Sequence, residues 1–351
     1  MISKLCQRFG GSATRSQEKR VFRVTKTGHL GAKILMMFST VVLLSCNPPQ
    51  KDYPLRLSTN SWVGYEPFYI AESMGYFSKD AIHLIEMPFS LTMDQSLRAG
   101  TLDAAAVSLS RALSLVGAGH DITVLMILNW SNGADQLIAH PSIKSVVDLK
   151  GKTVGAEENT VNGYLLQRAL QINGLSISDI TFKHTQNTDV ADAFRAGEIM
   201  AGAVYGAEIP ILLSLGARPI FDSSDIPGEI LDVLIVRTPY LEQNPDKIEQ
   251  LILAWFKGVD HLKHIAAGAK RPIGLMSDKA FKAAIRQIKF ASIIDNTDFL
   301  QNTAKKLEAL INLRLALTNS LGISRERSRT SQTKPLINSV PFFDAISKVG
   351  E

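Results

Sequence analysis

The chain has 351 residues, of which 45% are hydrophobic and 20% charged. This is the composition of a folded chain rather than a disordered one, and the length suits two lobes. Residues 1–45 hold eight basic residues and one acid. Removing these from the totals of 38 and 33 leaves 30 basic and 32 acidic residues. The net charge of +5 therefore belongs to the first 45 residues, and the net −2 of the rest argues against a nucleic-acid partner.

A short apolar run near the amino terminus is followed by a cysteine. The run covers residues 34–44, only eleven positions. That is too short to span a bilayer, which needs ~20 residues, but it suits the hydrophobic region of a signal peptide. Ser45 and Cys46 resemble the end of a bacterial lipobox, where a small residue precedes the thiol that accepts diacylglycerol. We expect residues 1–45 to be a lipoprotein-type signal peptide, Cys46 to be lipidated, and residues 46–53 to form a tether.

The cysteine and histidine content argues against disulfides and metal sites. Cys6 and Cys46 are the only cysteines, and cleavage before Cys46 leaves one thiol, so no internal disulfide can form. The seven histidines show neither HExxH nor Cys/His ligand spacing. His261 and His264 lie three apart on a predicted helix without a third ligand, which is typical of a solvated helix face. We therefore expect no bound metal.

An internal echo predicts two similar α/β units. Residues 97–108 (LRAGTLDAAAVS) and 194–205 (FRAGEIMAGAVY) are identical at six of twelve positions. In each copy an Arg-Ala-Gly sequence ends a predicted helix, and the Ala/Val run that follows predicts a strand. A coincidence of Ala/Gly-rich composition is the alternative, but the shared order of elements favours duplication.

Two such units predict two lobes that face each other across a cleft. In open α/β sheets, ligands bind outside the carboxyl ends of the strands. The loops that follow the predicted strands therefore form the candidate site, namely residues 60–66, 108–111, 129–135, 157–163 and 205–208.

The remaining elements are predicted in outline. Residues 121–128 form a buried strand, residues 137–139 continue it and cross between lobes, and residues 233–237 return. Asn244 and Pro245 start a helix, whose apolar stripe includes Trp255 as a core residue. Further along, residues 304–317 form a helix and residues 325–334 a solvated basic loop.

Several linked motifs in residues 55–262 resemble the nitrate/sulfonate/taurine-type ABC substrate-binding proteins, a family that also contains binding proteins for a thiamine pyrimidine precursor. These motifs are STNSWVGYEPFYIAESMGYF, SLRAGTLDAAAVSLSRAL, NWSNGAD, IKSVVDLKGKTVGAEENTVNGYLLQRAL, FRAGEIMAGAVY and LDVLIVRTPYLEQNPDKIEQLILAWF. The resemblance implies an α/β, two-lobed type II periplasmic-binding-protein fold with two hinge strands and a central ligand cleft. It implies hinge closure on the ligand, no cofactor and no catalysis.

The resemblance also implies lobe boundaries and ligand-binding residues. Lobe 1 comprises residues 54–136 and 237–351, and lobe 2 comprises residues 137–236. Many members carry Trp-Glu-Pro where this chain reads Tyr-Gly-Ala-Glu, which leaves the role of Glu208 open. The predicted ligand-binding residues are Trp62, Tyr65, Glu66, Ser108, Asn132, Asp135, Thr160, Asn162, Tyr205, Glu208 and Asp232.

The implied function is capture of a small molecule by a monomeric, lipid-anchored protein of the periplasm or cell surface, which delivers it to an ABC permease with its ATPase. A pyrimidine-precursor biosynthesis enzyme of the same fold is an alternative, but the exported leader and the lack of a cysteine cluster or a histidine near the loops argue against it. A ligand-sensing ectodomain is another, and it would normally need a transmembrane helix or fused domain after the lobes.

The charges of the candidate loops favour a neutral or cationic ligand. The candidate loops contain six acidic residues, and Arg111 is the only basic residue near them. A buried anion beside these carboxylates would be repelled. Nearby aromatic rings suit stacking or cation–π contact. We expect an amine or nitrogen heterocycle, a thiamine pyrimidine precursor being one candidate, although the helix start at Thr160 offers N–H donors to an anion. The acids are Glu66, Asp135, Glu157, Glu158, Glu208 and Asp232.

Overall fold

The computed structural model describes residues 53–87, 90–158, 160–266, 278–302 and 336–348. By its internal contacts the chain separates into residues 1–52 and residues 53–351, and every described residue belongs to the second unit. The predictions for the signal peptide, for Cys46 and for residues 304–317 and 325–334 lie outside the described residues. Within the described ranges, no helix combines the length and the apolar character needed to cross a membrane.

Six strands form the first sheet, in the order β11-β4-β10-β3-β1-β2. The first three strands of the chain pair in parallel, and β10 runs antiparallel between β3 and β4. Small and branched apolar residues fill these strands because the central ones are buried on both faces. The strands are β1 (Leu55–Thr59), β2 (Ile82–Glu86), β3 (Ala104–Ser108), β4 (Ile122–Ser131), β10 (Leu231–Arg237) and β11 (Ile288–Phe290).

Five strands form the second sheet, in the order β7-β6-β8-β5-β9. Here β6 pairs in parallel with β7 and β8, while β5 runs antiparallel between β8 and β9. The strands are β5 (Asp135–Ala139), β6 (Thr153–Ala156), β7 (Thr181–His184), β8 (Ala201–Tyr205) and β9 (Arg218–Asp222).

The two sheets repeat one topology. In the first sheet the order is β2-β1-β3, then the antiparallel strand β10, then β4. In the second sheet it is β7-β6-β8, then the antiparallel strand β5, then β9. The echoed segments occupy equivalent places, since α3 (Ser90–Ala99) precedes β3 and α6 (Val190–Arg195) precedes β8. Gly100 and Gly197 follow these helices with φ of 70° and 71°, a conformation that glycine adopts without a Cβ clash. The predicted pair of similar α/β units is confirmed.

Two chain segments pass between the sheets. Only residues 132–134 separate β4 in the first sheet from β5 in the second, so residues 137–139 belong to a new strand and do not continue β4. The second passage, which leads from the second sheet back to the first, ends before β10. Residues 233–237, which were expected to form this passage, therefore lie wholly in the first sheet. The Ser223 hydroxyl ties the segments together, at 2.7 Å from the Ser131 Oγ and 2.7 Å from the backbone nitrogen of Gly133.

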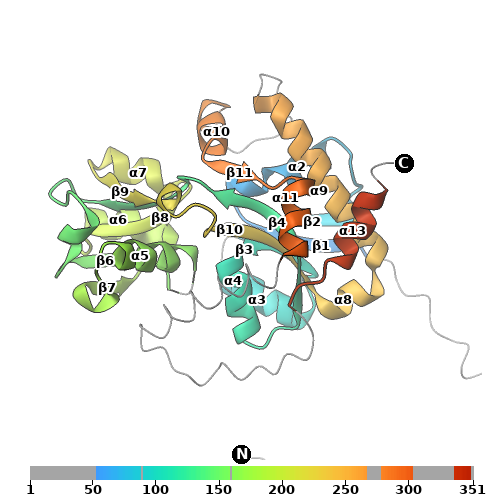
Figure 1. The fold of residues 1–351 in the computed structure, drawn as a ribbon, viewed down its shortest axis with the longest axis horizontal. Coiled ribbons are helices and arrows are strands. Elements are labelled where there is room, and N and C mark those ends of the chain that lie inside the picture. The colour runs from blue at the N-terminus through green and yellow to red at the C-terminus, as the bar shows by residue number, and fades with distance from the viewer. Residues whose placement is uncertain (1–52, 88–89, 159, 267–277, 303–335, 349–351) are drawn as a thin grey trace, which may run out of the picture. The chain divides into compact units, whose positions relative to one another are not determined.

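Helices cover both sheets, as Figure 1 shows. The longest, α9, packs along α2 and buries Trp255 completely, with its ring centroid 4.6 Å from that of Phe68, as predicted for a core residue. The helices of the first sheet are α2 (Glu66–Ser73), α3, α4 (Leu109–Gly117), α8 (Thr238–Gln243), α9 (Pro245–Ala266), α10 (Asp278–Ile285), α11 (Ile293–Gln301) and α13 (Val340–Ser347); those of the second are α5 (Val161–Ile172), α6 and α7 (Glu208–Ser214).

Candidate functional site

A cavity of about 710 Å³ lies at the carboxyl ends of strands from both sheets. This is the position that the parallel topology predicts for a ligand, and the volume suits a small organic molecule. Its wall consists of Ser58, Thr59, Asn60, Ser61, Trp62, Tyr65, Met87, Thr92, Met93, Asp94, Ala106, Val107, Ser108, Arg111, Asn129, Ser131, Asp135, Glu157, Glu158, Thr160, Val161, His184, Gln186, Asn187, Thr188, Tyr205, Ile230 and Asp232.

The cavity brings together seven of the eleven residues that the sequence predicts for ligand binding. They come from the ends of β1 and β3, from both passages between the sheets, and from the ends of β6 and β8. The seven are Trp62, Tyr65, Ser108, Asp135, Thr160, Tyr205 and Asp232.

The other four predicted residues do not line the cavity. Glu66 opens α2. Asn132 is exposed, and its backbone N–H donates to the carbonyl of Gln287. Glu208 is buried and accepts the backbone N–H of Ala191 at the start of α6. Because this carboxylate satisfies a helix N-terminus, it faces the interior of the second half.

The fourth of these, Asn162, supports a residue that does line the cavity. Its amide nitrogen donates to the Oδ1 atom of Asn187 at 3.1 Å, and the same oxygen accepts the backbone N–H of Tyr205 at 3.1 Å. The Thr160 hydroxyl accepts the N–H of Asn162 and caps α5. A loop residue that the sequence analysis missed, Asn187, thus faces the cavity with support from a predicted one.

Two carboxyl groups stand where the chain passes between the sheets. Asp135 is the first residue of β5 and Asp232 the second of β10, and they are 4% and 8% exposed. Burial raises the pKa of Asp135 to about 6, although a contact with the Ser131 hydroxyl lowers it. Burial and the charge of Asp135 raise the pKa of Asp232 to about 7. The pair is therefore costly to ionise in the absence of a ligand.

An amide and an indole complete this part of the wall. The Asn129 side chain is 1% exposed, its Nδ2 donates to the carbonyl of Gly64 at 3.1 Å, and its Oδ1 makes no hydrogen bond with the described residues. The indole nitrogen of Trp62 approaches Asp232 and lowers its pKa, but its geometry falls short of a normal hydrogen bond. The Trp62 ring meets Tyr205 edge to face, with centroids 5.8 Å apart.

A compensated ion pair lies elsewhere on the wall. The Arg111 guanidinium contacts the Asp94 carboxylate at 2.5 Å, and both belong to the first half of the chain. The Ser108 hydroxyl accepts the backbone N–H of Arg111 and so caps α4. Across the cavity, burial raises the pKa of Glu157, and the Arg111 charge offsets part of this. Arg111, the one guanidinium that the described residues contribute to the wall, is thus already balanced by a carboxylate.

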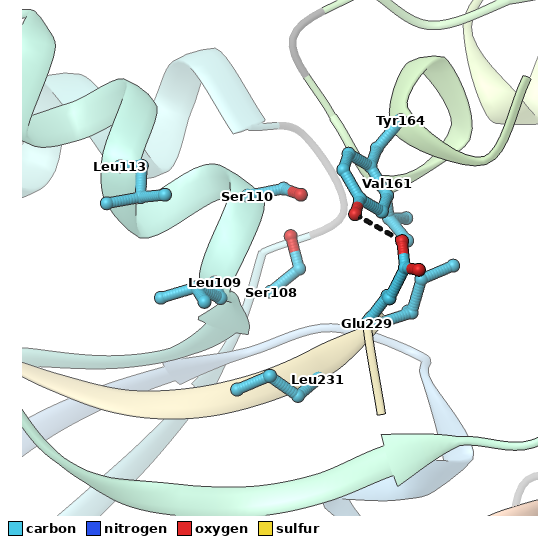
Figure 2. A pocket seen from close by; sticks show the side chains of 9 residues that line it. Ser108, Leu109, Ser110, Leu113, Val161, Tyr164, Glu229 and Leu231 are labelled. Atoms are coloured by element: carbon cyan, nitrogen blue, oxygen red, sulfur yellow. Dashed lines mark hydrogen bonds between the residues drawn. The ribbon is translucent and has the colours of Figure 1, made fainter. Parts of the chain in front are cut away.

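Helices α4 and α5 approach each other beside the cavity. Figure 2 shows the small space between them, about 10 Å³, with Ser108 and Ser110 facing Tyr164. The Tyr164 hydroxyl donates to Glu229 at 2.6 Å, and the Arg168 guanidinium donates to both oxygens of that carboxylate. Burial would raise the pKa of Glu229, but these hydrogen bonds outweigh it and hold the pKa below its usual value. Glu229 therefore stays charged and fixes α5 next to the return passage.

Comparisons with known proteins agree with this geometry. A family model described as NMT1/THI5 like matches residues 62–264. The putative aliphatic sulfonates-binding protein of Escherichia coli is 27% identical over 189 residues, which is 53% of this chain and 59% of that protein. A putative binding protein of Brucella abortus is 27% identical over 166 residues, 45% of this chain and 50% of that protein. The chain thus spans only about half the length of these curated relatives.

Solved structures confirm the fold. The periplasmic aliphatic sulphonate binding protein SsuA from Escherichia coli matches with a TM-score of 0.60 and 20% identity, covering 75% of this chain and 93% of that one. The alkanesulfonate-binding protein SsuA from Xanthomonas axonopodis pv. citri, bound to MOPS, matches with a TM-score of 0.59 and 19% identity, covering 73% and 93%. The predicted two-lobed periplasmic-binding-protein fold and the predicted family resemblance are confirmed.

Proposed function

The chain belongs to the NMT1/THI5-like family, and from this premise we propose that it is the solute-binding component of an ABC importer. The observation that carries the proposal is the 710 Å³ cavity walled by strand ends of both sheets. Polar groups and three aromatic rings converge there, which is how binding proteins hold a small molecule. The protein captures its ligand, closes by hinge motion and docks on a permease that works with an ATPase.

The two passages between the sheets serve as the hinge in this proposal. One lobe carries the first sheet, including β10, and the other carries the second sheet, including β5, so the lobe boundaries lie in the two passages, at residues 132–134 and just before Leu231, rather than at residues 136–137 and 236–237. The Ser131–Ser223 contact joins both passages at one point, so the lobes turn about a common axis. The cavity residues named above contact the ligand from both sides, and the protein acts as a monomer without cofactor or catalysis.

The ligand is a neutral or cationic amine or nitrogen heterocycle, of which a pyrimidine precursor of thiamine is one example. Support comes from the five carboxylates of the wall, Asp94, Asp135, Glu157, Glu158 and Asp232, against Arg111 and His184. The relatives from Escherichia coli and Xanthomonas are named for sulfonates, so sulfonates are the competing class. Native mass spectrometry of protein purified from its own host identifies the bound molecule. A single bound amine or heterocycle, recovered unchanged after long incubation, is expected; a bound sulfonate would overturn the ligand class, and chemical turnover the function.

Lipid anchoring at Cys46 places the protein at the periplasmic or outer face of a membrane. A diacylglyceryl group adds two acyl chains, and two chains hold a protein stably where one does so only marginally. The change Cys46→Ala should move the protein from the membrane fraction to the soluble or unprocessed fraction, while the matched change Cys6→Ala should not. Fractionation followed by immunoblotting measures this. Unchanged membrane association of a normally sized Cys46→Ala product would refute the anchor.

A further inference from the structure

One stretch of the cavity wall presents acceptor oxygens without a matching cation. We call Asn129, Asp135 and Asp232 the acceptor cluster. All three side chains are at least nine-tenths buried and line the cavity. They stand on β4, β5 and β10, at or beside the two passages between the sheets. In the first sheet Asn129 and Asp232 are direct cross-strand partners, so their side chains share one face.

The Asn129 amide shows that this face has a hydrogen-bond acceptor for which the described residues supply no donor. Its nitrogen is used by the Gly64 carbonyl, whereas its oxygen has no hydrogen-bond partner among the described residues. An acceptor left unsatisfied in the interior costs free energy unless a donor arrives with a ligand. Because the neighbouring groups are two carboxyls, a ligand donor meets acceptors on all three residues.

The charged and titratable groups around the acceptor cluster do not neutralise it. Arg111 is in contact with Asp94. The hydroxyls of Tyr65 and Tyr205 have raised pKa values, chiefly through burial, and so stay uncharged. Contacts with Tyr65, Trp62 and Asn129 lower the pKa of Asp232, but these are neutral donors and bring no positive charge. Among the described residues, the other charged and titratable groups of the cavity wall are Tyr65, Asp94, Arg111, Glu157, Glu158, His184 and Tyr205.

The aromatic side chains beside the cluster favour a flat cation over a compact one. Trp62, Tyr65 and Tyr205 line the same cavity, and ring faces attract planar, delocalised cations that are weakly hydrated. An alkylammonium group carries a stronger hydration shell, which is costlier to remove in so buried a place. A planar cation with several N–H groups can also reach acceptors that stand on separate strands.

Resting on the proposed solute-binding function, we propose that the acceptor cluster is the recognition site for a planar nitrogen cation with at least two N–H donors, of the amidinium or guanidinium class. Its N–H groups donate to the carboxylates of Asp135 and Asp232 and to the Asn129 oxygen. Because these groups flank both passages between the sheets, the cation binds at the pivot of the hinge and contacts strands of both halves.

This arrangement links ligand binding to protons. With pKa values of about 6 for Asp135 and about 7 for Asp232, the ligand-free pair binds about one proton at pH 6.5. A bound cation favours the ionised carboxylates, so binding near pH 6.5 releases protons to the solvent. Affinity for the cation rises from pH 5 to pH 8. Binding of an anionic solute would instead take up protons.

Calorimetric titration of the purified full chain with benzamidinium tests the proposal, with methanesulfonate and taurine as competing probes. Titrations at pH 6.5 in two buffers of different ionisation enthalpy give the number and sign of protons exchanged. We expect benzamidinium to bind, to release protons, and to bind about 30-fold or more weakly to Asp135→Asn and Asp232→Asn. The matched change Asp80→Asn, at an exposed position, leaves the affinity unchanged.

Several outcomes would overturn the recognition site. They are no benzamidinium binding, binding without proton release, and variant affinities equal to that of Asp80→Asn. The proton count on the unmodified chain keeps the test decisive if a variant fails to fold. Tight sulfonate binding in place of benzamidinium would remove this recognition site but leave the solute-binding function standing. Failure of the function itself is detected separately, by import measured in whole cells.

Discussion

Asp232 sits in the wall of an aqueous cavity, yet it has the pKa of a buried acid, about 7 against an ordinary value of 3.8. An acid with a raised pKa in the folded protein costs stability as pH rises from its unfolded value through its folded value. The penalty is absent near pH 3 and complete above pH 7. Binding proteins often tolerate such a cost because the same group holds the ligand.

The change Asp232→Asn should therefore stabilise the ligand-free protein at pH 8. The neutral amide avoids the ionisation penalty, so the free energy of unfolding rises by up to about 4 kcal/mol, since the pKa of Asp232 is raised from 3.8 to about 7 and each pKa unit corresponds to about 1.4 kcal/mol. At pH 3 the two proteins unfold alike. Urea denaturation at both pH values measures the difference, with Asp80→Asn as the exposed control. A destabilised variant at pH 8 would show that Asp232 is a structural rather than a binding group.

Gly64 keeps the acceptor cluster in register. A Cβ atom at this position would lie 2.2 Å from the Trp62 indole nitrogen and 2.8 Å from the Asn129 amide nitrogen. The change Gly64→Ala should displace both side chains and weaken ligand binding about tenfold or more, because small misplacements in a binding site are costly.

The control for this prediction is a glycine that does not line the cavity. Gly117 ends α4, and a Cβ there meets nothing within 4 Å, so Gly117→Ala should bind normally. Affinities from calorimetry and far-ultraviolet circular dichroism of both variants make the comparison. Equal affinities for the two variants would show that Trp62 and Asn129 have no part in binding.

The residues of the site were predictable wherever they directly follow a strand. Ser108 and Tyr205 end echoed strands, and Thr160 follows β6, so the strand pattern predicted the loops that hold them and the family resemblance implied the residues themselves. Residue 129 belongs to the candidate loop 129–135, but the family resemblance did not imply Asn129 as a ligand group, and the structure places it inside β4. Asp94 was missed because it belongs to α3, and no local signal brings that helix to the cavity.

At the scale of elements, β4 shows how a helix can complete a sheet edge. Beyond the short strand β11, the buried Asn296 side chain of α11 accepts the N–H of Ile127 at 2.7 Å and donates to its carbonyl at 3.0 Å. The amide thus replaces one ladder step of a neighbouring strand. It also donates to the Ser292 carbonyl of its own helix.

Removing this amide should destabilise the protein. The change Asn296→Ala leaves a buried donor and acceptor of Ile127 unsatisfied, so the free energy of unfolding should fall by about 2–3 kcal/mol. The matched change Asn302→Ala, at an exposed position at the end of α11, should cost far less. Urea denaturation of both variants measures this, and equal losses would contradict the bridging role.

Elements built from local signals were predictable, and those built from distant pairing were not. The helix from Pro245 follows a regular apolar stripe, and the echoed helices end at glycines that take a positive φ. The antiparallel insertion of β5 and β10 into opposite sheets depends on pairings between residues that are roughly 60 to 130 positions apart in the sequence. Neither strand carries a local sign of which sheet it joins, so residues 137–139 were expected to continue β4.

At the scale of the whole molecule, duplication accounts for the cavity. Each half contributes the same strand order and the same kind of carboxyl-end loops. Each sheet also contains one antiparallel strand next to a passage, β10 in the first sheet and β5 in the second. Asp135, the first residue of β5, and Asp232, the second of β10, are therefore placed by the topology itself, one beside each passage. The loop positions in the sequence predicted an excess of carboxylates over bases at the site. The described residues of the cavity wall have the same excess.

Uptake of the host's own ligand, once mass spectrometry has identified it, tests the central claim most directly. Cells of the source organism that lack this chain should lose energy-dependent uptake of the labelled compound. Re-expression of the unmodified chain or of Asp80→Asn should restore it, whereas a chain carrying both Asp135→Asn and Asp232→Asn, exported to the same level, should not. Uptake that continues unchanged without the chain would contradict its assignment as the solute-binding component of an importer.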